Sequence, residues 1–279
     1  MNLWVSILLG LVQGATEFLP ISSSGHLAIF RNIYEYATGS ILAENPQFYE
    51  VLLHMGSLCA VFIAFHKDIA ELWRGFVSLF SEQGRGDEAK RPSRRLILLL
   101  LIATLPMIVG AVLQGQVAKL SDQLWFVGLA LIGTGVLLFI ADRAKPGKKT
   151  EKTARVSDAA AVGLIQAVAV IPGLSRSGAT ISAGIMRDFD RQFALKFSFL
   201  LSIPAILGAT LLKLIVAFSE EVKLGEFAVY LPGVLAAFVT AYFSIALLKR
   251  MAKRGKFGAF VYYCLAAGVI TVILNFTLT

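Results

Sequence analysis

The sequence predicts an all-α polytopic membrane protein, and two observations support this class. Hydrophobic residues make up 57% of the 279 residues, and the mean hydropathy of +0.73 is far above that of a soluble domain. The apolar residues also form continuous runs of roughly twenty, which is the length of helix that crosses a hydrocarbon core of about 30 Å. A transmembrane barrel would show alternating segments of about ten residues instead.

Six apolar runs are long enough to cross the membrane, and two further apolar segments are broken in the middle by Pro, Gly and Ser. We predict that each broken segment is a re-entrant hairpin of two half-length helices. The chain then has ten helices in one membrane domain. In order, they form the hairpin 3–34, the spans 47–66, 93–115 and 122–141, the hairpin 157–187, and the spans 193–217, 226–249 and 256–277.

The two hairpins align with each other without a gap, as GLVQGATEFLPISSSGH (10–26) and GLIQAVAVIPGLSRSGA (163–179). Six of the seventeen positions are identical, and they fall mainly at polar and glycine positions. We therefore predict an internal duplication, with repeat 1 at residues 1–141 and repeat 2 at residues 157–279. Because three spans follow each hairpin, and three is an odd number, the second repeat is expected to be inverted relative to the first.

Basic residues gather in four loops, which together hold 21 of the 26 Lys and Arg residues. These loops are 67–95, 142–157, 187–196 and 249–256. The positive-inside rule places them in the cytoplasm, so both termini lie outside and the two hairpins enter from opposite faces. Topology and contact with anionic membrane lipids then explain the net charge of +8, without nucleic-acid binding. Residues 3–19 could also form a full span, which would reverse this orientation.

The first hairpin carries polar side chains inside the membrane, where each is unfavourable unless it has a partner or a function. Gln13 and Glu17 are four residues apart and project from one face of the first half-helix. His26 lies early in the second half-helix. Three consecutive serines precede it and can cap that half-helix, whose free N–H groups attract an anion. They are Ser22, Ser23 and Ser24.

The tip of the second hairpin repeats this design and adds Arg176. Arginine binds phosphate oxygens bidentately, and neighbouring glycines let the backbone approach the same oxygens. We therefore predict a bound phosphate. Together the two tips offer an acid, a hydroxyl, an imidazole and a cation, which is a working set for phosphoryl transfer. Besides Arg176, the predicted phosphate-binding residues are Ser22, Ser24, Gly173, Ser175, Ser177, Gly178 and Thr180.

A second acid and histidine lie at the outer start of the 47–66 span. Glu50 and His54 are four residues apart and therefore share one face of that helix. Two interpretations remain open at this point. The pair either lines the entrance of the site, or it is an interfacial acid with a hydrogen-bonded histidine.

The motifs QGATEFLPISSSGHL (13–27) and PGLSRSGAT (172–180), with FSFLLSIPAILGA (197–209), resemble the signature regions of the undecaprenyl-pyrophosphate phosphatases, also known as bacitracin-resistance proteins. The resemblance covers essentially the whole chain. It implies a multi-pass enzyme of the bacterial inner membrane. Such an enzyme removes the terminal phosphate from a polyprenyl pyrophosphate lipid and recycles this carrier for peptidoglycan synthesis.

The resemblance also implies roles for individual residues and a divalent cation, Mg²⁺ or Ca²⁺. The family's (E/Q)-x-x-x-E element falls on Gln13 and Glu17, its serine and histidine on Ser23 and His26, and its arginine on Arg176. Because Gln13 is neutral, metal binding would depend on Glu17 and on the substrate's phosphates. His26 either takes the proton of an attacking Ser23 or activates water directly.

A transporter is the alternative, because inverted repeats with broken helices also build secondary carriers for anionic substrates. A polyprenyl-phosphate flippase would need the anion site but no nucleophile. Since Glu17, Ser23 and His26 all belong to the first hairpin, we expect the site to open toward the periplasm. The sequence leaves open whether two copies form a homodimer.

Overall fold

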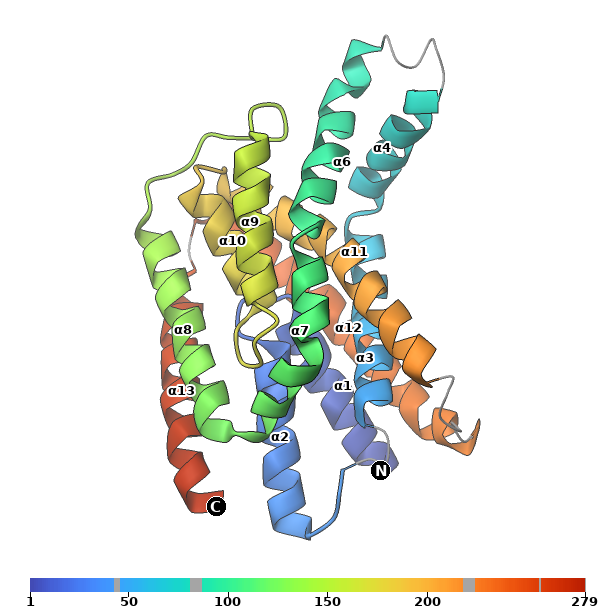
Figure 1. The fold of residues 1–279 in the computed structure, drawn as a ribbon, viewed down its shortest axis with the longest axis vertical. Helices are drawn as coiled ribbons and strands as arrows, with labels where there is room; N and C mark the ends of the chain where they lie inside the picture. Colours follow the sequence, from blue (N-terminus) through green and yellow to red (C-terminus); the bar gives the residue numbers. More distant parts are fainter. Residues whose placement is uncertain (43–45, 81–86, 218–223, 256, 279) are drawn as a thin grey trace.

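The structure, a computed structural model, describes residues 1–42, 46–80, 87–217, 224–255 and 257–278. Helices make up almost all of the regular structure in these segments (Figure 1). Several of them are long and apolar enough to cross a membrane. The predicted class, an all-α polytopic membrane protein, is therefore confirmed.

Five of the six predicted spans have direct counterparts among the described residues. Each is a helical stretch that is long and apolar enough to cross the hydrocarbon core. The first counterpart is broken at Pro106, as expected of a proline inside a helix. In chain order the counterparts are α6 (Arg91–Thr104) with α7 (Met107–Ala118), α8 (Leu124–Arg143), α11 (Arg191–Ala217), α12 (Leu224–Lys253) and α13 (Gly258–Leu278).

The predicted span 47–66 is different, because it is not a straight crossing helix by itself. Helix α3 (Pro46–Ala64) is followed after a bend of 81° by α4 (His66–Val77), and only the two together pass as a span. Charged side chains interrupt the apolar surface of α4, so this helix is amphipathic. It packs along α6.

Both predicted hairpins are present. The first is α1 (Leu3–Glu17) and α2 (Ser23–Thr38), and the second is α9 (Val156–Val168) and α10 (Arg176–Met186). The 15 residues of α1 rise only about 22 Å, too little to cross the core. Figure 1 shows that both termini lie at one end and that α1 and α9 start from opposite ends. Inverted repeats require this arrangement, and the duplication itself stays a prediction.

The first helix of each hairpin packs against a helix of the other half, α1 on α12 and α9 on α6. Helix α1 approaches α12 so closely that a Cβ atom at Gly10 would lie 2.0 Å from the carbonyl oxygen of Gly233. Close contact of this kind is how small residues hold membrane helices together. The packing fixes the two hairpins inside the bundle with their tips toward each other.

Candidate active site

Each hairpin tip turns at a serine that caps the helix after it. Ser22 accepts a hydrogen bond from the N–H of Gly25 at 3.2 Å, and Ser175 accepts one from the N–H of Gly178 at 3.1 Å. The serines therefore act as N-caps of α2 and α10. The positive ends of two helix dipoles consequently lie close to each other, which favours an anion between them.

The backbone of both tips is held in conformations that favour glycine. Ser22 has a φ angle of 71°, although it is not a glycine, and Gly173 has a φ angle of 90°. A Cβ atom at Gly173 would also lie 2.5 Å from the carbonyl oxygen of Val127 on α8. Such strain persists only where the surrounding structure enforces it, and it is concentrated at functional sites.

Hydrogen bonds join the two tips directly. The N–H of Gly173 donates to Ser24 Oγ at 3.4 Å, and Ser177 Oγ donates to the carbonyl oxygen of Leu19 at 3.1 Å. The tip of the second hairpin is also anchored to α8, because the N–H of Ser175 donates to Thr134 Oγ1 at 2.9 Å. Residues about 150 positions apart in the sequence thus form one rigid unit.

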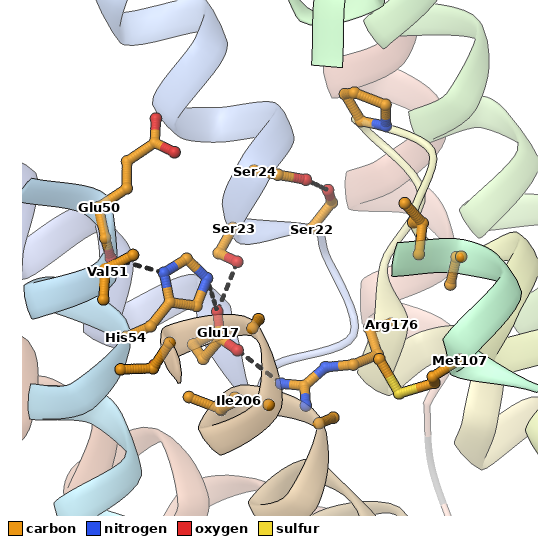
Figure 2. A pocket seen from close by; sticks show the side chains of 18 of the residues that line it. Glu17, Ser22, Ser23, Ser24, Glu50, Val51, His54, Met107, Arg176 and Ile206 are labelled. Atoms are coloured by element: carbon orange, nitrogen blue, oxygen red, sulfur yellow. Dashed lines mark hydrogen bonds and ion pairs between the residues drawn. The ribbon is translucent and has the colours of Figure 1, made fainter. Parts of the chain in front are cut away.

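Glu17 lies at the centre of this unit, with a side chain that is only 4% exposed. Its Oε1 accepts a hydrogen bond from Arg176 Nη2 at 2.5 Å, in an ion pair that crosses between the hairpins. Its Oε2 accepts hydrogen bonds from Ser23 Oγ at 2.6 Å and from Gln13 Nε2 at 2.8 Å. Figure 2 shows the side chains of Ser23, Arg176 and His54 converging on this carboxylate.

The imidazole at this cluster belongs to His54 on α3. Its Nε2 lies 3.4 Å from Glu17 Oε2, and its Nδ1 is hydrogen-bonded to the carbonyl oxygen of Glu50 at 2.7 Å. Both Glu50 and His54 line the cavity described below. The sequence predicts either an entrance pair or an interfacial acid with a hydrogen-bonded histidine. Their spacing of four was the available signal, but it does not reveal which helix the pair faces.

His26 lies elsewhere, although the resemblance implied a catalytic role for it. Its Nδ1 is hydrogen-bonded to the carbonyl oxygen of Ser22 at 2.7 Å, and its Nε2 to the hydroxyl of Tyr263 at 2.6 Å. The ring stacks on that of Tyr263 at a centroid distance of 5.6 Å. His26 is not among the lining residues of the cavity. The structure therefore brings Glu17, Ser23 and Arg176 together without it.

The cluster lies in the wall of a cavity of about 620 Å³. One part of the lining is polar and comes from the two hairpin tips and α3. The rest is mostly apolar and comes largely from α7, the turn after α9, and α11. Such a cavity suits an anionic head group attached to a hydrocarbon chain. The apolar lining includes Met107, Ile108, Val170, Ile206, Ala209 and Leu211.

The predicted phosphate-binding residues divide into two groups. Ser22, Ser24 and Ser175 line the cavity together with Arg176, but four others do not. Thr180 Oγ1, for example, is hydrogen-bonded to Ser198 Oγ at 2.6 Å, which ties α10 to α11. These four residues stabilise the conformation of the tip and do not line the cavity. They are Gly173, Ser177, Gly178 and Thr180.

Two buried polar atoms of the cluster have no hydrogen-bond partner, namely Arg176 Nη1 and Gln13 Oε1. An unsatisfied buried group is unfavourable, so Arg176 Nη1, whose residue lines the cavity, is suited to a bound ligand. Gln13 is not among the lining residues. A phosphate oxygen fits the guanidinium of Arg176. The carboxylate of Glu17 and the hydroxyl of Ser23, which both line the cavity, fit a hard cation such as Mg²⁺ or Ca²⁺.

Within the part of the chain that the structure describes, acidic, His and Cys side chains alone do not form such a metal site. Across the described residues, no three His, Cys, Asp or Glu side chains gather into a group that could hold a metal ion. A cation beside Glu17 would therefore take most of its ligands from water and from a phosphate. Mg²⁺ commonly binds to proteins in this way.

Comparison with known proteins points to one family. The family model described as "Bacitracin resistance protein BacA" matches residues 6–270. The undecaprenyl-diphosphatase of Alkaliphilus metalliredigens is 38% identical to this chain, over 99% of both chains. The undecaprenyl-diphosphatase of Methanosphaera stadtmanae is also 38% identical, over 98% of both chains. That of Korarchaeum cryptofilum is 37% identical, over 98% of this chain and 100% of its own length.

Proposed function

The chain belongs to the bacitracin resistance protein BacA family, and we propose that it is an undecaprenyl-pyrophosphate phosphatase. In this reaction water removes the terminal phosphate of a polyprenyl pyrophosphate and leaves the polyprenyl monophosphate. The product is the carrier lipid in the form that cell-wall synthesis reuses. The observation that carries the proposal is the contact of Ser23 and Arg176 with one buried carboxylate, Glu17, beside a partly apolar cavity.

Binding of the terminal phosphate is assigned to the second hairpin. Arg176 lines the cavity and has an unpartnered Nη1, so its guanidinium can donate to a phosphate oxygen while Nη2 keeps its contact with Glu17. The capped start of α10 adds N–H groups and the positive end of the helix dipole. These donors are fixed before the substrate arrives, as electrostatic catalysis requires.

Attack on the phosphate is assigned to the first hairpin. Ser23 Oγ attacks the terminal phosphorus, and its proton passes to Glu17 Oε2, which already accepts its hydrogen bond at 2.6 Å. The bond from phosphorus to the bridging oxygen breaks, and polyprenyl phosphate leaves as an anion. Water then cleaves the phosphoserine, and Glu17 returns the proton to Ser23. These proposed steps do not use His26, which is hydrogen-bonded to Tyr263 and does not line the cavity.

His54 is expected to position Glu17 for proton transfer with Ser23, since His54 Nε2 lies 3.4 Å from Glu17 Oε2. The variant His54→Leu should lower kcat for phosphate release by about 10-fold to 100-fold, because the carboxylate loses a polar neighbour. His54→Gln keeps a hydrogen-bonding group and should retain most of the activity. His26→Gln, assayed in parallel, should lose less activity than His54→Leu, and the opposite order would contradict the assignment.

A divalent cation, Mg²⁺ or Ca²⁺, would be held by Glu17 together with water and the substrate's phosphates. When bound, it neutralises charge that develops on the phosphate oxygens. We expect EDTA to lower the rate of phosphate release by at least ~10²-fold, given the several kcal/mol that such neutralisation provides. A titration with free Mg²⁺ or Ca²⁺ should restore the rate. Full activity after exhaustive chelation would contradict a metal at this site.

The site is proposed to open toward the outer face of the inner membrane. Helix α1 starts at the end of the molecule that carries both termini, and the basic ends of α4, α6, α8 and α9 lie at the opposite end (Figure 1). Basic loops face the cytoplasm under the positive-inside rule. The first hairpin, with Glu17 and Ser23, would then be reached from the periplasm.

Product analysis tests the proposed function. Purified protein in proteoliposomes is incubated with Mg²⁺ and undecaprenyl pyrophosphate, and the lipid products and inorganic phosphate are measured. The proposal predicts equal amounts of undecaprenyl phosphate and inorganic phosphate. A flippase on the same fold would move the lipid between leaflets and release no phosphate, and that result would contradict the proposal.

A further inference from the structure

We propose that Arg31 forms a second, outer phosphate-binding position, which holds a phosphate group before or after it occupies the site at Ser23. The inference rests on the proposed phosphatase function and adds a residue that the reaction steps above do not use. Arg31 lies on α2, in the same hairpin as the nucleophile. It lines the same cavity as Ser23.

The position of Arg31 follows from the geometry of α2. Ser23, Leu27 and Arg31 are spaced by four residues, and all three line the cavity, so they form one stripe along its wall. Arg31 lies eight positions after Ser23 along the helix, a rise of about 12 Å. A phosphate held at Arg31 is therefore about two helical turns from the nucleophile. Arg31 marks the part of the cavity toward the outer end of α2.

The present partner of Arg31 can be displaced. Arg31 Nη2 forms an ion pair with Asp122 and lies 3.4 Å from Ser121 Oγ, both at the end of the 3-10 helix Lys119–Asp122. The Arg31 side chain is 20% exposed, but that of Asp122 is 68% exposed. Ion pairs with a well-hydrated partner contribute little stability. A phosphate carries more charge and matches the guanidinium fork, so it can replace the carboxylate.

The inner site gives a reason for a second cation. Arg176 is already paired with Glu17, so these two charges largely cancel, and a divalent cation would offset only part of the negative charge of an incoming pyrophosphate. Arg31 supplies positive charge along the same cavity. Glu50 lines this region too, and both it and Arg31 line a small adjoining cavity. The carboxylate of Glu50 weakens anion binding near Arg31. Weak binding suits a position that a phosphate occupies only transiently.

Two single variants with opposite expected effects test this inference. Arg31→Gln should raise KM for undecaprenyl pyrophosphate about 3-fold to 10-fold, with a much smaller change in kcat, because a capture contact outside the reacting centre is lost. Asp122→Asn should lower KM, because it removes the competing carboxylate. If the ion pair merely clamps α2 to the 3-10 helix, both variants break the clamp and shift KM in the same direction. That result would overturn the proposal.

The double variant separates a local effect from a general change of charge. In the double variant Arg31→Gln/Asp122→Asn, the Asp122→Asn change should no longer lower KM, because the guanidinium that it would release is absent. If Asp122→Asn still lowers KM in the absence of Arg31, the proposal is overturned. Arg91→Gln is the matched control. Arg91 forms an exposed ion pair with Glu88 at the start of α6, and its loss should leave KM unchanged.

The inhibition constant of inorganic phosphate shows whether Arg31 binds the head group of the incoming lipid or the released phosphate. Inhibition of the wild-type protein and of Arg31→Gln by inorganic phosphate is measured beside KM for the lipid. A rise in KM alone assigns Arg31 to the incoming head group, and a weaker inhibition by phosphate alone assigns it to the released product. If neither constant changes, Arg31 binds no phosphate and the proposal fails.

A binding measurement keeps this inference separate from the phosphatase itself. Inorganic pyrophosphate is titrated into Ser23→Ala protein, with and without Arg31→Gln, and its Kd is determined by calorimetry. The proposal predicts that pyrophosphate binds more weakly to Ser23→Ala/Arg31→Gln than to Ser23→Ala. Should the wild-type protein hydrolyse no lipid, this measurement would still decide whether Arg31 contributes to an anion site. Equal affinities would exclude that contribution.

Discussion

Replacing Ser23 by alanine is expected to lower kcat for phosphate release by more than ~10³-fold, the size of effect seen when a serine nucleophile is removed. The reason is the 2.6 Å hydrogen bond from Ser23 Oγ to the buried Glu17, which activates this hydroxyl among the three serines of the tip. Steady-state assays with undecaprenyl pyrophosphate measure the loss. Acid-quenched wild-type protein, incubated with lipid labelled in the terminal phosphate, should carry the label on Ser23.

Ser24→Ala is the matched control for this variant. Ser24 also lines the cavity, but its Oγ is bonded to Ser22 Oγ and to the N–H of Gly173 rather than to Glu17. It should lose far less activity than Ser23→Ala. Full activity in Ser23→Ala would contradict the covalent route and favour direct attack by water.

Replacing Arg176 by lysine is expected to lower kcat/KM by about 10²-fold to 10³-fold, as for other donors that stabilise a transition state. Lysine keeps the positive charge but loses the planar fork that contacts Glu17 with one nitrogen and leaves Nη1 for a phosphate. The measurement is the rate of phosphate release across a range of lipid concentrations. Arg187→Lys provides the control, because Arg187 pairs with the buried Asp158, away from the cavity.

Circular dichroism and thermal melting should show that both arginine variants are folded, since each keeps a cation beside its carboxylate. Arg176→Lys should lose activity without loss of structure. Wild-type activity in a folded Arg176→Lys protein would mean that charge alone suffices at this position. The bridging role assigned to Arg176, with Nη2 on Glu17 and Nη1 on a phosphate oxygen, would then be wrong.

The class of the fold and the two hairpins were predictable because the physical signals are local. Long apolar runs have few solutions in a membrane other than helices, and a Pro, Gly and Ser cluster in the middle of a run leaves two half-helices. The caps at Ser22 and Ser175 follow from the same local chemistry. The pairing of Glu17 with Arg176 could be anticipated only through the alignment of the two hairpins with each other.

The position of the imidazole was not predictable, because it depends on contacts between distant segments. His26 is near Ser23 in the sequence, but a hydrogen bond to Tyr263, 237 positions later, holds its ring away from the cavity. His54 reaches Glu17 only because α3 packs beside α1. The spacing of residues within α3 says which side chains share a face, but it does not say what that face meets.

The bend after α3 was missed for a related reason. Hydropathy shows where the apolar run ends near Phe65, but the direction of the chain beyond it depends on what the next segment can pack against. Helix α4 buries one face on α6 and turns by 81° to do so. A hydropathy profile averages over neighbouring residues in the sequence, so it does not show that α4 will pack on α6.

The most direct test of the central claim, that the joined hairpin tips are a phosphatase site, is the rate of phosphate release from undecaprenyl pyrophosphate in the presence of Mg²⁺. Wild-type protein is assayed beside Glu17→Ala, from the first hairpin, and Arg176→Ala, from the second. We expect release by the wild type and near-complete loss in both folded variants. Release that survives in either variant, or none from a wild-type protein that still binds the lipid, would contradict the claim.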